Sequence, residues 1–205
     1  MEKKKIQKFQ SHIRQRWATN RRDLPWRKTT DPYAIWISET MLCQTQVSRV
    51  VVYYKNRLQL FPTLEDLAQA TVSEVLLARS GLGYNSRGIR VHQAAKMIVE
   101  KDSFPTTYKE LVVLPGVGDY VANAILAFAH NEDVAVIDTN IRRILIHQFD
   151  LDEKVSLHEL KTLALQVLPQ GYARDRYNAL MDYGALELTA KKTGIRPLTR
   201  QSKFE

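Results

Sequence analysis

The sequence predicts an all-α protein, and three observations support this fold class. Apolar residues recur at spacings of three and four along most of the 205 residues, which is the period of one helix face. Alternation of apolar and polar residues, the pattern of a half-buried strand, is nearly absent. The one β-like run, residues 134–137, is short. Glycine or proline punctuates the segments between the periodic stretches, as expected where helices start and stop.

Local signals place the individual helices. Asp31-Pro32 starts one helix, and Pro62 stops another. Thr63 and Thr71 are each followed three residues later by an acid, which is the pattern of a capped helix start. In chain order, the predicted helices cover residues 4–19, 31–42, 48–61, 63–70, 71–81, 85–101 and 108–114, an apolar segment after the glycines at 116 and 118, a segment from 141, and residues 156–167 and 172–188. The basic tail from Thr189 is expected to be loosely ordered.

The net charge of +8 is concentrated at the two ends of the chain. Residues 1–28 hold ten basic and two acidic side chains, and residues 187–205 hold five and two. Basic ends around a mildly acidic middle fit a polyanionic partner, although solvated helix faces are an equally common reason for such runs. No apolar run approaches the ~20 residues that span a bilayer, and the N-terminus lacks the apolar core of a signal peptide. We therefore expect no membrane partner and a cytoplasmic, nucleoid-associated protein, or a nuclear one in a eukaryote.

The most informative stretch is residues 114–140. It begins with Leu-Pro-Gly-Val-Gly, a tight glycine hairpin in front of an apolar helix, and ends with a lone carboxylate, Asp138, after a short apolar run. A glycine hairpin that opens a helix presents backbone N–H groups suited to a phosphate. An acid among apolar neighbours suits the stabilisation of positive charge on a sugar. Asp138 is also a good N-cap for the helix from 141. The pattern favours an enzyme that holds a DNA backbone and attacks a glycosidic bond.

Six short motifs follow one another in a fixed order. They include Leu-Pro-Gly-Val-Gly-Asp-Tyr at 114–120 and Ile-Asp-Thr-Asn at 137–140, and the full set occupies residues 24–27, 31–47, 81–84, 114–120, 137–140 and 181–185. With these motifs the chain resembles the helix-hairpin-helix (HhH-GPD) DNA glycosylase superfamily, and within it the catalytic domain of MutY-type adenine DNA glycosylases. The resemblance implies two helical lobes, residues 29–133 and residues 1–28 plus 134–205, with the active site in the cleft between them.

The resemblance also implies the chemistry. Members of this family flip the target base out of the duplex. Glu39 matches the general acid that protonates the departing purine, and Asp138 matches the aspartate that stabilises the oxocarbenium-like sugar. Asn140 matches a residue that organises the site. Tyr120 stands where bifunctional members have a lysine, and because a phenol forms no Schiff base, the resemblance implies a monofunctional enzyme that leaves the strand intact.

Further site residues follow from the same motifs. Gly116 and Gly118 match the hairpin that holds a DNA phosphate, often with a monovalent cation. The family's residues that contact DNA or fill the gap in the base stack correspond in this sequence to Gln44, Thr45, Leu82 and Tyr84. The family's residues that line the base pocket correspond to Trp26, Arg27 and Asp182. Trp26 and Leu82 are equally typical of residues in a hydrophobic core. The implied partner is double-stranded DNA with a mismatched or damaged base, bound by a monomer.

The chain departs from the family pattern in two places. Members usually hold an iron–sulfur cluster through four cysteines just after the Gly-Ala-Leu motif, but residues 188–197 contain none and Cys43 is the single cysteine. We therefore expect no cluster and no cofactor apart from a monovalent cation at the hairpin. The resemblance also implies a C-terminal domain that reads oxidised guanine, which we expect to be absent because the sequence stops at Glu205. The interpretation favoured here is excision of adenine opposite guanine or 8-oxoguanine. Excision of thymine or uracil opposite guanine, or DNA binding without catalysis, are the alternatives.

Overall fold

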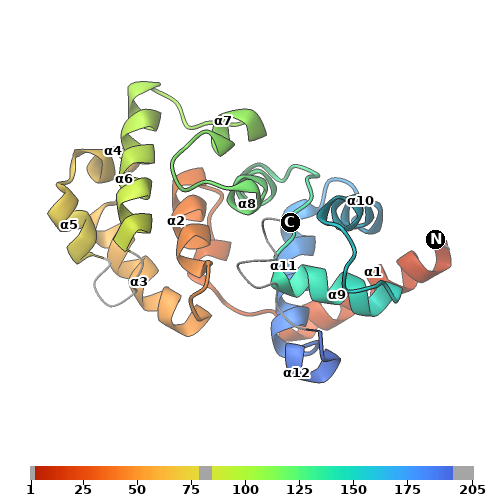
Figure 1. Cartoon of the computed structure of the whole chain (residues 1–205). Coiled ribbons are helices and arrows are strands. Elements are labelled where there is room, and N and C mark those ends of the chain that lie inside the picture. The colour runs from red at the N-terminus through yellow and green to blue at the C-terminus, as the bar shows by residue number, and fades with distance from the viewer. Residues whose placement is uncertain (1–2, 79–84, 196–205) are drawn as a thin grey trace. The chain divides into compact units, whose positions relative to one another are not determined.

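The computed structural model describes residues 3–78 and 85–195, and the regular elements in these ranges are all helices (Figure 1). The predicted all-α class is confirmed. The chain separates into two compact units. Unit 1 consists of Met1–Arg22 with Asn131–Glu205, and unit 2 is the continuous segment Asp23–His130. The lobe boundaries that the resemblance implies, 28/29 and 133/134, lie a few residues later in the sequence.

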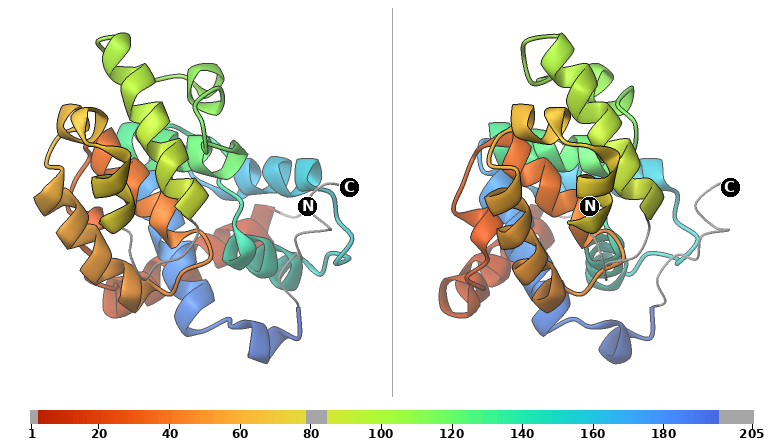
Figure 2. Two further views of the ribbon diagram at one scale, coloured as in Figure 1. Left: turned by 60° about the vertical axis from the view of Figure 1, so that its left-hand side comes forward. Right: turned by 90° about the vertical axis from the view of Figure 1, so that its left-hand side faces the viewer.

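Unit 2 is built around a buried central helix, α2. Every residue of α2 from Tyr33 to Met41 is buried, and α2 packs against α3 and α8. The long helix α6 packs instead against α4 and α5 (Figure 2). The elements of this unit are η1 (Pro25–Arg27), α2 (Pro32–Leu42), α3 (Val47–Leu60), α4 (Leu64–Gln69), α5 (Val72–Leu77), α6 (Asn85–Glu100), α7 (Tyr108–Val112) and α8 (Asp119–His130). A polar side chain on α2 is thus largely shielded from water.

Side-chain caps fix the starts of four helices of unit 2, α2, α4, α5 and α7. The Asp31 carboxylate accepts hydrogen bonds from the backbone N–H groups of Tyr33 and Ala34, at 3.1 and 3.2 Å. Thr63, Thr71 and Thr107 each begin a helix with a reciprocal capping box. The helix after Thr71 ends at Leu77, earlier than the predicted residue 81.

Unit 1 joins the beginning of the chain to its last third. The helix α11 packs against α1 and α9, and the ring centroids of Phe9 and Phe149 lie 5.6 Å apart in an edge-to-face contact. Its helices are α1 (Lys3–Asn20), α9 (Thr139–Phe149), α10 (Leu157–Val167), α11 (Ala173–Leu186) and α12 (Ala190–Thr193). The last of these is a short helix within the tail that had been expected to be loose; it ends at Gly194, whose φ is +73°.

The β-like run at residues 134–137 forms no regular element. Instead, a side chain of α11 satisfies its backbone. The Tyr177 hydroxyl accepts a hydrogen bond from the Val136 N–H at 2.9 Å and donates one to the Val134 carbonyl at 2.8 Å. This single hydroxyl takes the place of a partner strand and holds the segment that leads into Asp138.

Within residues 3–78 and 85–195, no helix is both long enough and apolar enough to cross a bilayer.

Candidate active site

The glycine hairpin is a tight turn that leads directly into α8. The Val117 N–H donates to the Leu114 carbonyl at 3.1 Å, with Pro115 and Gly116 at the two central positions. The φ of Gly116 is +81°, so this is the Pro-Gly arrangement of a type II turn, which requires a residue without a Cβ at the second central position. Gly116 and Gly118 are exposed, whereas Val117 is buried and anchors the turn in unit 2. The hairpin therefore presents its backbone at the surface, next to the first turn of a twelve-residue helix.

A buried carboxyl group and a phenol form a direct pair in unit 2. Glu39 lies on the central helix α2 and is 3% exposed. The hydroxyl of Tyr120, in the first turn of α8, donates a hydrogen bond to Glu39 Oε2 at 2.7 Å. The close packing of α2 on α8 brings these two predicted site residues, 81 positions apart, into contact. A carboxyl group in such a place is shielded from solvent and fixed in orientation, as proton transfer requires.

Asp138 caps helix α9 in unit 1. Its Oδ1 accepts a hydrogen bond from the Ile141 N–H at 2.7 Å, and its Oδ2 accepts one from Asn140 Nδ2 at 3.1 Å. Burial raises the pKa of the Asp138 carboxyl above its ordinary value, while these hydrogen bonds and the positive charge of Arg143 oppose that rise. The capping role and the proposed chemical role are compatible, because a cap holds the carboxylate in one orientation.

The orientation of Asn140 is set by a buried arginine, Arg143. The Arg143 guanidinium donates to Asn140 Oδ1 at 2.7 Å, so the amide must turn its Nδ2 toward Asp138. Arg143 also donates to the carbonyls of Gly184 and Leu188, at 2.7 and 2.8 Å. It thereby ties α9 to the end of α11. Arg143 is absent from the residues that the motifs single out, because two of its three described partners are backbone carbonyls more than forty positions away in the sequence.

Gly184 leaves room for this network. A Cβ at this position would lie 2.8 Å from Asn140 Cβ and 3.1 Å from Ile144 Cδ1. Both distances are shorter than ordinary carbon contacts, so α11 can approach α9 this closely only with glycine here. The motif at 181–185 contains this residue, and the close approach is a physical reason for it.

Asp182 fastens α11 to α1. Its buried carboxylate accepts hydrogen bonds from Trp17 Nε1 at 3.2 Å and from the Arg22 N–H at 3.1 Å, and it also pairs with the Arg22 guanidinium. The motif match had placed Asp182 in the base pocket. Every contact described for it joins parts of unit 1, and its role toward a base stays a prediction.

Trp26 and Arg27, the other two residues predicted for the base pocket, lie on η1 in unit 2. Trp26 is buried and packs edge-to-face against Tyr54, with ring centroids 5.5 Å apart. The contact with Tyr54 gives Trp26 a place in the core, and its role in a pocket stays a prediction.

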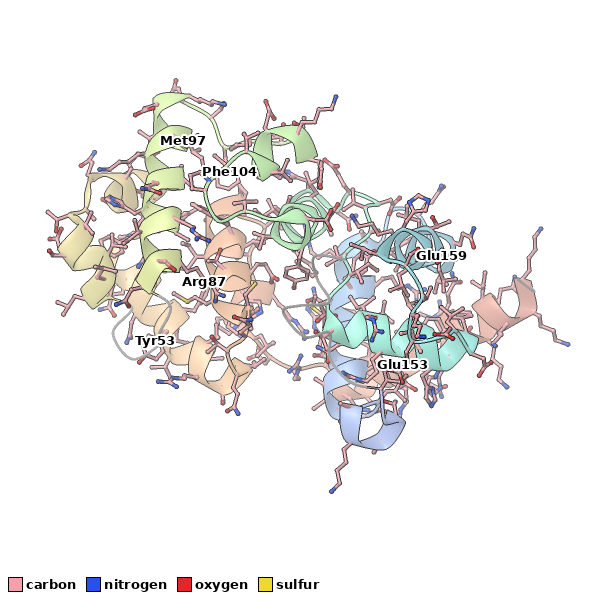
Figure 3. The ribbon with its side chains drawn as sticks, in the orientation of Figure 1. Tyr53, Arg87, Met97, Phe104, Glu153 and Glu159 are labelled. Carbon is pink, nitrogen blue, oxygen red and sulfur yellow. The ribbon has the colours of Figure 1, made fainter. Side chains whose placement is uncertain are left out.

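The turn after α2 carries Gln44 in a left-handed conformation. The φ of Gln44 is +68°, which is uncommon for a residue with a side chain, and Gln44 is exposed. Arg87 of α6, labelled in Figure 3, donates to the Cys43 carbonyl at 2.6 Å and to Gln44 Oε1 at 3.4 Å. The next residue, Thr45, donates its N–H to the Leu42 carbonyl at 3.4 Å. Leu82 and Tyr84, the other two residues predicted to contact bases, lie outside the described residues.

Residues 37–170 match the family model described as HhH-GPD superfamily base excision DNA repair protein. The chain belongs to the HhH-GPD superfamily. This match covers more than half of the sequence and includes the Glu39–Tyr120 pair, the hairpin and the Asp138 cap. The resemblance drawn from the six motifs is therefore confirmed at the level of the family.

Several curated members of the superfamily are similar to this chain over most of its length. It is 36% identical over 170 residues to the adenine DNA glycosylase of Buchnera aphidicola, covering 81% of this chain and 48% of that protein. It is 38% identical over 200 residues to the human adenine DNA glycosylase, covering 90% of this chain and 36% of that protein. The chain thus spans about a third to a half of the length of these relatives.

Among solved structures, a thermostable thymine-DNA glycosylase is similar over its whole length. The TM-score is 0.82 at 28% sequence identity, and the match covers 98% of each chain. The helical fold therefore has a counterpart in a solved structure of about the same length.

Proposed function

We propose that this chain is a monofunctional DNA glycosylase that removes adenine from a pair with guanine or 8-oxoguanine in base excision repair. The observation that carries the proposal is the buried Glu39 carboxyl held by the Tyr120 hydroxyl at 2.7 Å. A purine leaves more easily when it is protonated, so the reaction needs an acid that is shielded from water and correctly aimed. The names of the relatives from Buchnera aphidicola and human supply the substrate class.

In the proposed reaction, Glu39 gives a proton to the adenine ring as the bond between the base and the sugar C1′ breaks. The bonding electrons leave with the base, which departs as neutral adenine, and positive charge develops on the sugar. The Asp138 carboxylate stabilises that charge. Water then adds to C1′ and loses a proton, which leaves an abasic site in an intact strand.

Tyr120 supports this assignment to the monofunctional class. A phenol hydrogen-bonded to Glu39 supplies no amine, so no Schiff base forms with the sugar. We expect no borohydride-trapped covalent complex between the chain and substrate DNA, and strand cleavage only after alkali is added. The iron–sulfur cluster typical of relatives does not fit the residues present, because such a cluster needs about four thiolates and the sequence holds one cysteine.

The decisive experiment is single-turnover excision on a panel of duplexes with adenine opposite 8-oxoguanine, guanine or cytosine, and thymine or uracil opposite guanine. Alkali then reveals each abasic site. We expect excision of adenine opposite guanine and 8-oxoguanine, loss of this activity in Glu39→Gln, and slower excision in Tyr120→Phe. A wild-type chain that leaves both adenine duplexes intact contradicts the proposal.

A second candidate function is excision of thymine or uracil opposite guanine. The similarity to the thermostable thymine-DNA glycosylase favours it, because that match covers 98% of both chains. The same panel separates the two candidates. Preferred cleavage of the thymine and uracil duplexes, unaffected by Glu39→Gln, supports the second function over the first.

A further inference from the structure

An arginine of α6 lies directly against the glycine hairpin. A Cβ built on Gly116 would lie 3.1 Å from Arg90 Cβ and 3.6 Å from Arg90 Cδ. The aliphatic part of Arg90 therefore covers the space that a side chain at 116 would fill. Glycine at position 116 therefore has two effects. It allows the positive φ of the turn, and it lets the Arg90 stem approach the backbone.

Arg90 is exposed and forms no hydrogen bond or ion pair with any residue in the described parts of the chain. Its neighbour one turn earlier behaves differently. The Arg87 guanidinium donates hydrogen bonds to the carbonyls of Thr40 and Cys43 and to the Gln44 side chain. The two arginines lie three positions apart and hence on similar faces of α6. Arg87 fastens the helix to the turn after α2, whereas the aliphatic stem of Arg90 lies against the hairpin.

The first turn of α8 carries a negative charge next to the hairpin. The first residue of α8 is an acid, Asp119, and its carboxylate would repel a phosphate placed at the helix start. That carboxylate accepts hydrogen bonds from the Tyr108 hydroxyl at 2.9 Å and from Asn123 Nδ2 at 3.3 Å. Both bonds are to Asp119 Oδ1, so this oxygen is engaged within the protein, and Arg90 adds a positive charge on the residue that lies against Gly116.

We propose that Arg90 is a phosphate-binding residue that completes the hairpin, so that one DNA phosphate is held by the backbone around Gly116 and Gly118 together with the Arg90 guanidinium. The proposal rests on the proposed function in that it takes DNA as the ligand. Arginine suits this position because its planar fork can bind two phosphate oxygens at once, which a lysine ammonium does not do.

The first test measures duplex affinity across a series of salt concentrations, with an undamaged duplex and an adenine–guanine duplex as probes. Arg90→Ala should weaken binding about fivefold and lower the slope of log affinity against log salt by about 0.9, the value for one phosphate contact. Lys96→Ala is the matched control. Lys96 is also an exposed cation on α6 without a described partner, but six positions further on it faces a different side of the helix. A slope unchanged in Arg90→Ala, or lowered equally in Lys96→Ala, overturns the proposal.

The second test locates the contact on the DNA. Single phosphates of the adenine–guanine duplex are replaced one at a time by uncharged methylphosphonates, and affinity is measured for wild type, Arg90→Ala, Arg90→Lys and Lys96→Ala. One replacement should weaken wild type and Lys96→Ala but have little effect on Arg90→Ala, because that variant has already lost the contact. Arg90→Lys should restore part of the sensitivity at the same phosphate. A sensitivity pattern in Arg90→Ala identical to that of wild type contradicts the proposal.

These outcomes are separable from failure of the proposed function. A wild-type chain that binds duplex but excises no base removes the enzymatic proposal and leaves the Arg90 test intact. Normal excision with Arg90→Ala indistinguishable from Lys96→Ala removes the Arg90 proposal alone. Because Arg90 is exposed, we expect unchanged unfolding midpoints in the variants, which separates a lost contact from a lost fold.

Discussion

At the scale of single residues, Asp138 has two roles that place different demands on one carboxyl. As a cap it needs only acceptor oxygens, whereas in the proposed reaction it needs a negative charge. Asp138→Asn separates these roles, because asparagine still caps a helix well. We expect this variant to lose excision by at least about 100-fold while its duplex affinity stays within about twofold of wild type. Single-turnover kinetics and fluorescence anisotropy measure the two quantities. Substantial residual excision contradicts the proposed role.

The raised pKa of Asp138 gives the same residue a pH signature. An acid whose pKa is higher in the folded than in the unfolded state binds protons more readily when folded, so its contribution to stability is present at low pH and is lost as pH rises through the folded pKa. Relative to Asp138→Asn, wild type should therefore lose stability as the pH rises from about 4, the pKa of an ordinary aspartate, toward the raised pKa of the folded state. Above that pKa, the stability difference between the two proteins should not change further.

Urea unfolding of both proteins over this pH range measures the effect. Excision should follow the opposite course, since the ionised form acts, and should rise with pH through the same region. A stability difference between the two proteins that does not vary with pH contradicts the assigned shift.

The residues of the candidate site could be predicted from the sequence only where a short motif contains them. Glu39, Tyr120 and Asp138 stand in short local patterns, and the structure places Glu39 beside Tyr120 and Asp138 beside Asn140. Arg143 could not be found this way, because carbonyl acceptors carry no sequence signal.

At the scale of elements, the contact between α9 and α11 depends on Arg143. Arg143→Lys leaves the carbonyls of Gly184 and Leu188 and the Asn140 amide without the full set of donors. We expect a loss of about 2 kcal/mol in the free energy of unfolding and, because Asn140 is no longer fixed toward Asp138, a fall of about tenfold or more in excision rate.

Arg142→Lys is the control for this variant. Arg142 is equally buried but donates to the Glu153 carbonyl, in the loop after α9. It should lose stability without a specific loss of excision rate at a temperature where it is folded. Equal kinetic effects in both variants argue against a positioning role for Arg143.

The hairpin offers a second comparison between neighbouring positions. Gly116→Ala places a Cβ on a residue with φ of +81° and against the Arg90 stem, whereas a Cβ at Gly118 meets no atom within 4 Å. We expect Gly116→Ala to lower the free energy of unfolding by about 1–2 kcal/mol and Gly118→Ala to change it by less than about 0.5 kcal/mol. Thermal or urea unfolding of the two variants decides this, and a reversed order contradicts the turn geometry.

Element boundaries were predictable where the cap is local. Thr63 and Thr71 form their capping boxes as the sequence indicates, since donor and acceptor lie three residues apart. The run at 134–137 shows the opposite case. Its β-branched composition gives a β-like signal, but its backbone is satisfied by the Tyr177 hydroxyl from a distant helix, and no local pattern announces that contact.

At the scale of the whole molecule, net charge is the property most open to measurement. The excess of basic residues lies in residues 1–28 and 187–205. If these residues neutralise several DNA phosphates, log affinity should fall with log salt at a slope of about −0.9 for each phosphate. Isothermal titration at several salt concentrations measures the slope. A slope near zero means that the basic ends face solvent rather than DNA.

The fold class was predictable from helical periodicity, and the family from motif order, because both are statistical properties of many residues. The division into units was less accessible from periodicity, because unit 1 joins segments more than a hundred residues apart. That pairing depends on contacts such as Asp182 with Trp17 and Arg22, which are specific to the folded chain.

Unit 1 is formed by two segments that unit 2 separates in the sequence, and this order affects folding during synthesis on the ribosome. Helix α1 leaves the exit tunnel before unit 2, but its packing partner α11 begins only at Ala173, after all of unit 2 has been made. At about 5–20 residues per second this interval lasts roughly 8–30 s. During that time unit 2 can complete its own core, while the apolar side of α1, with Phe9 and Ile13, lacks its full cover and is the segment that a nascent-chain chaperone would shield.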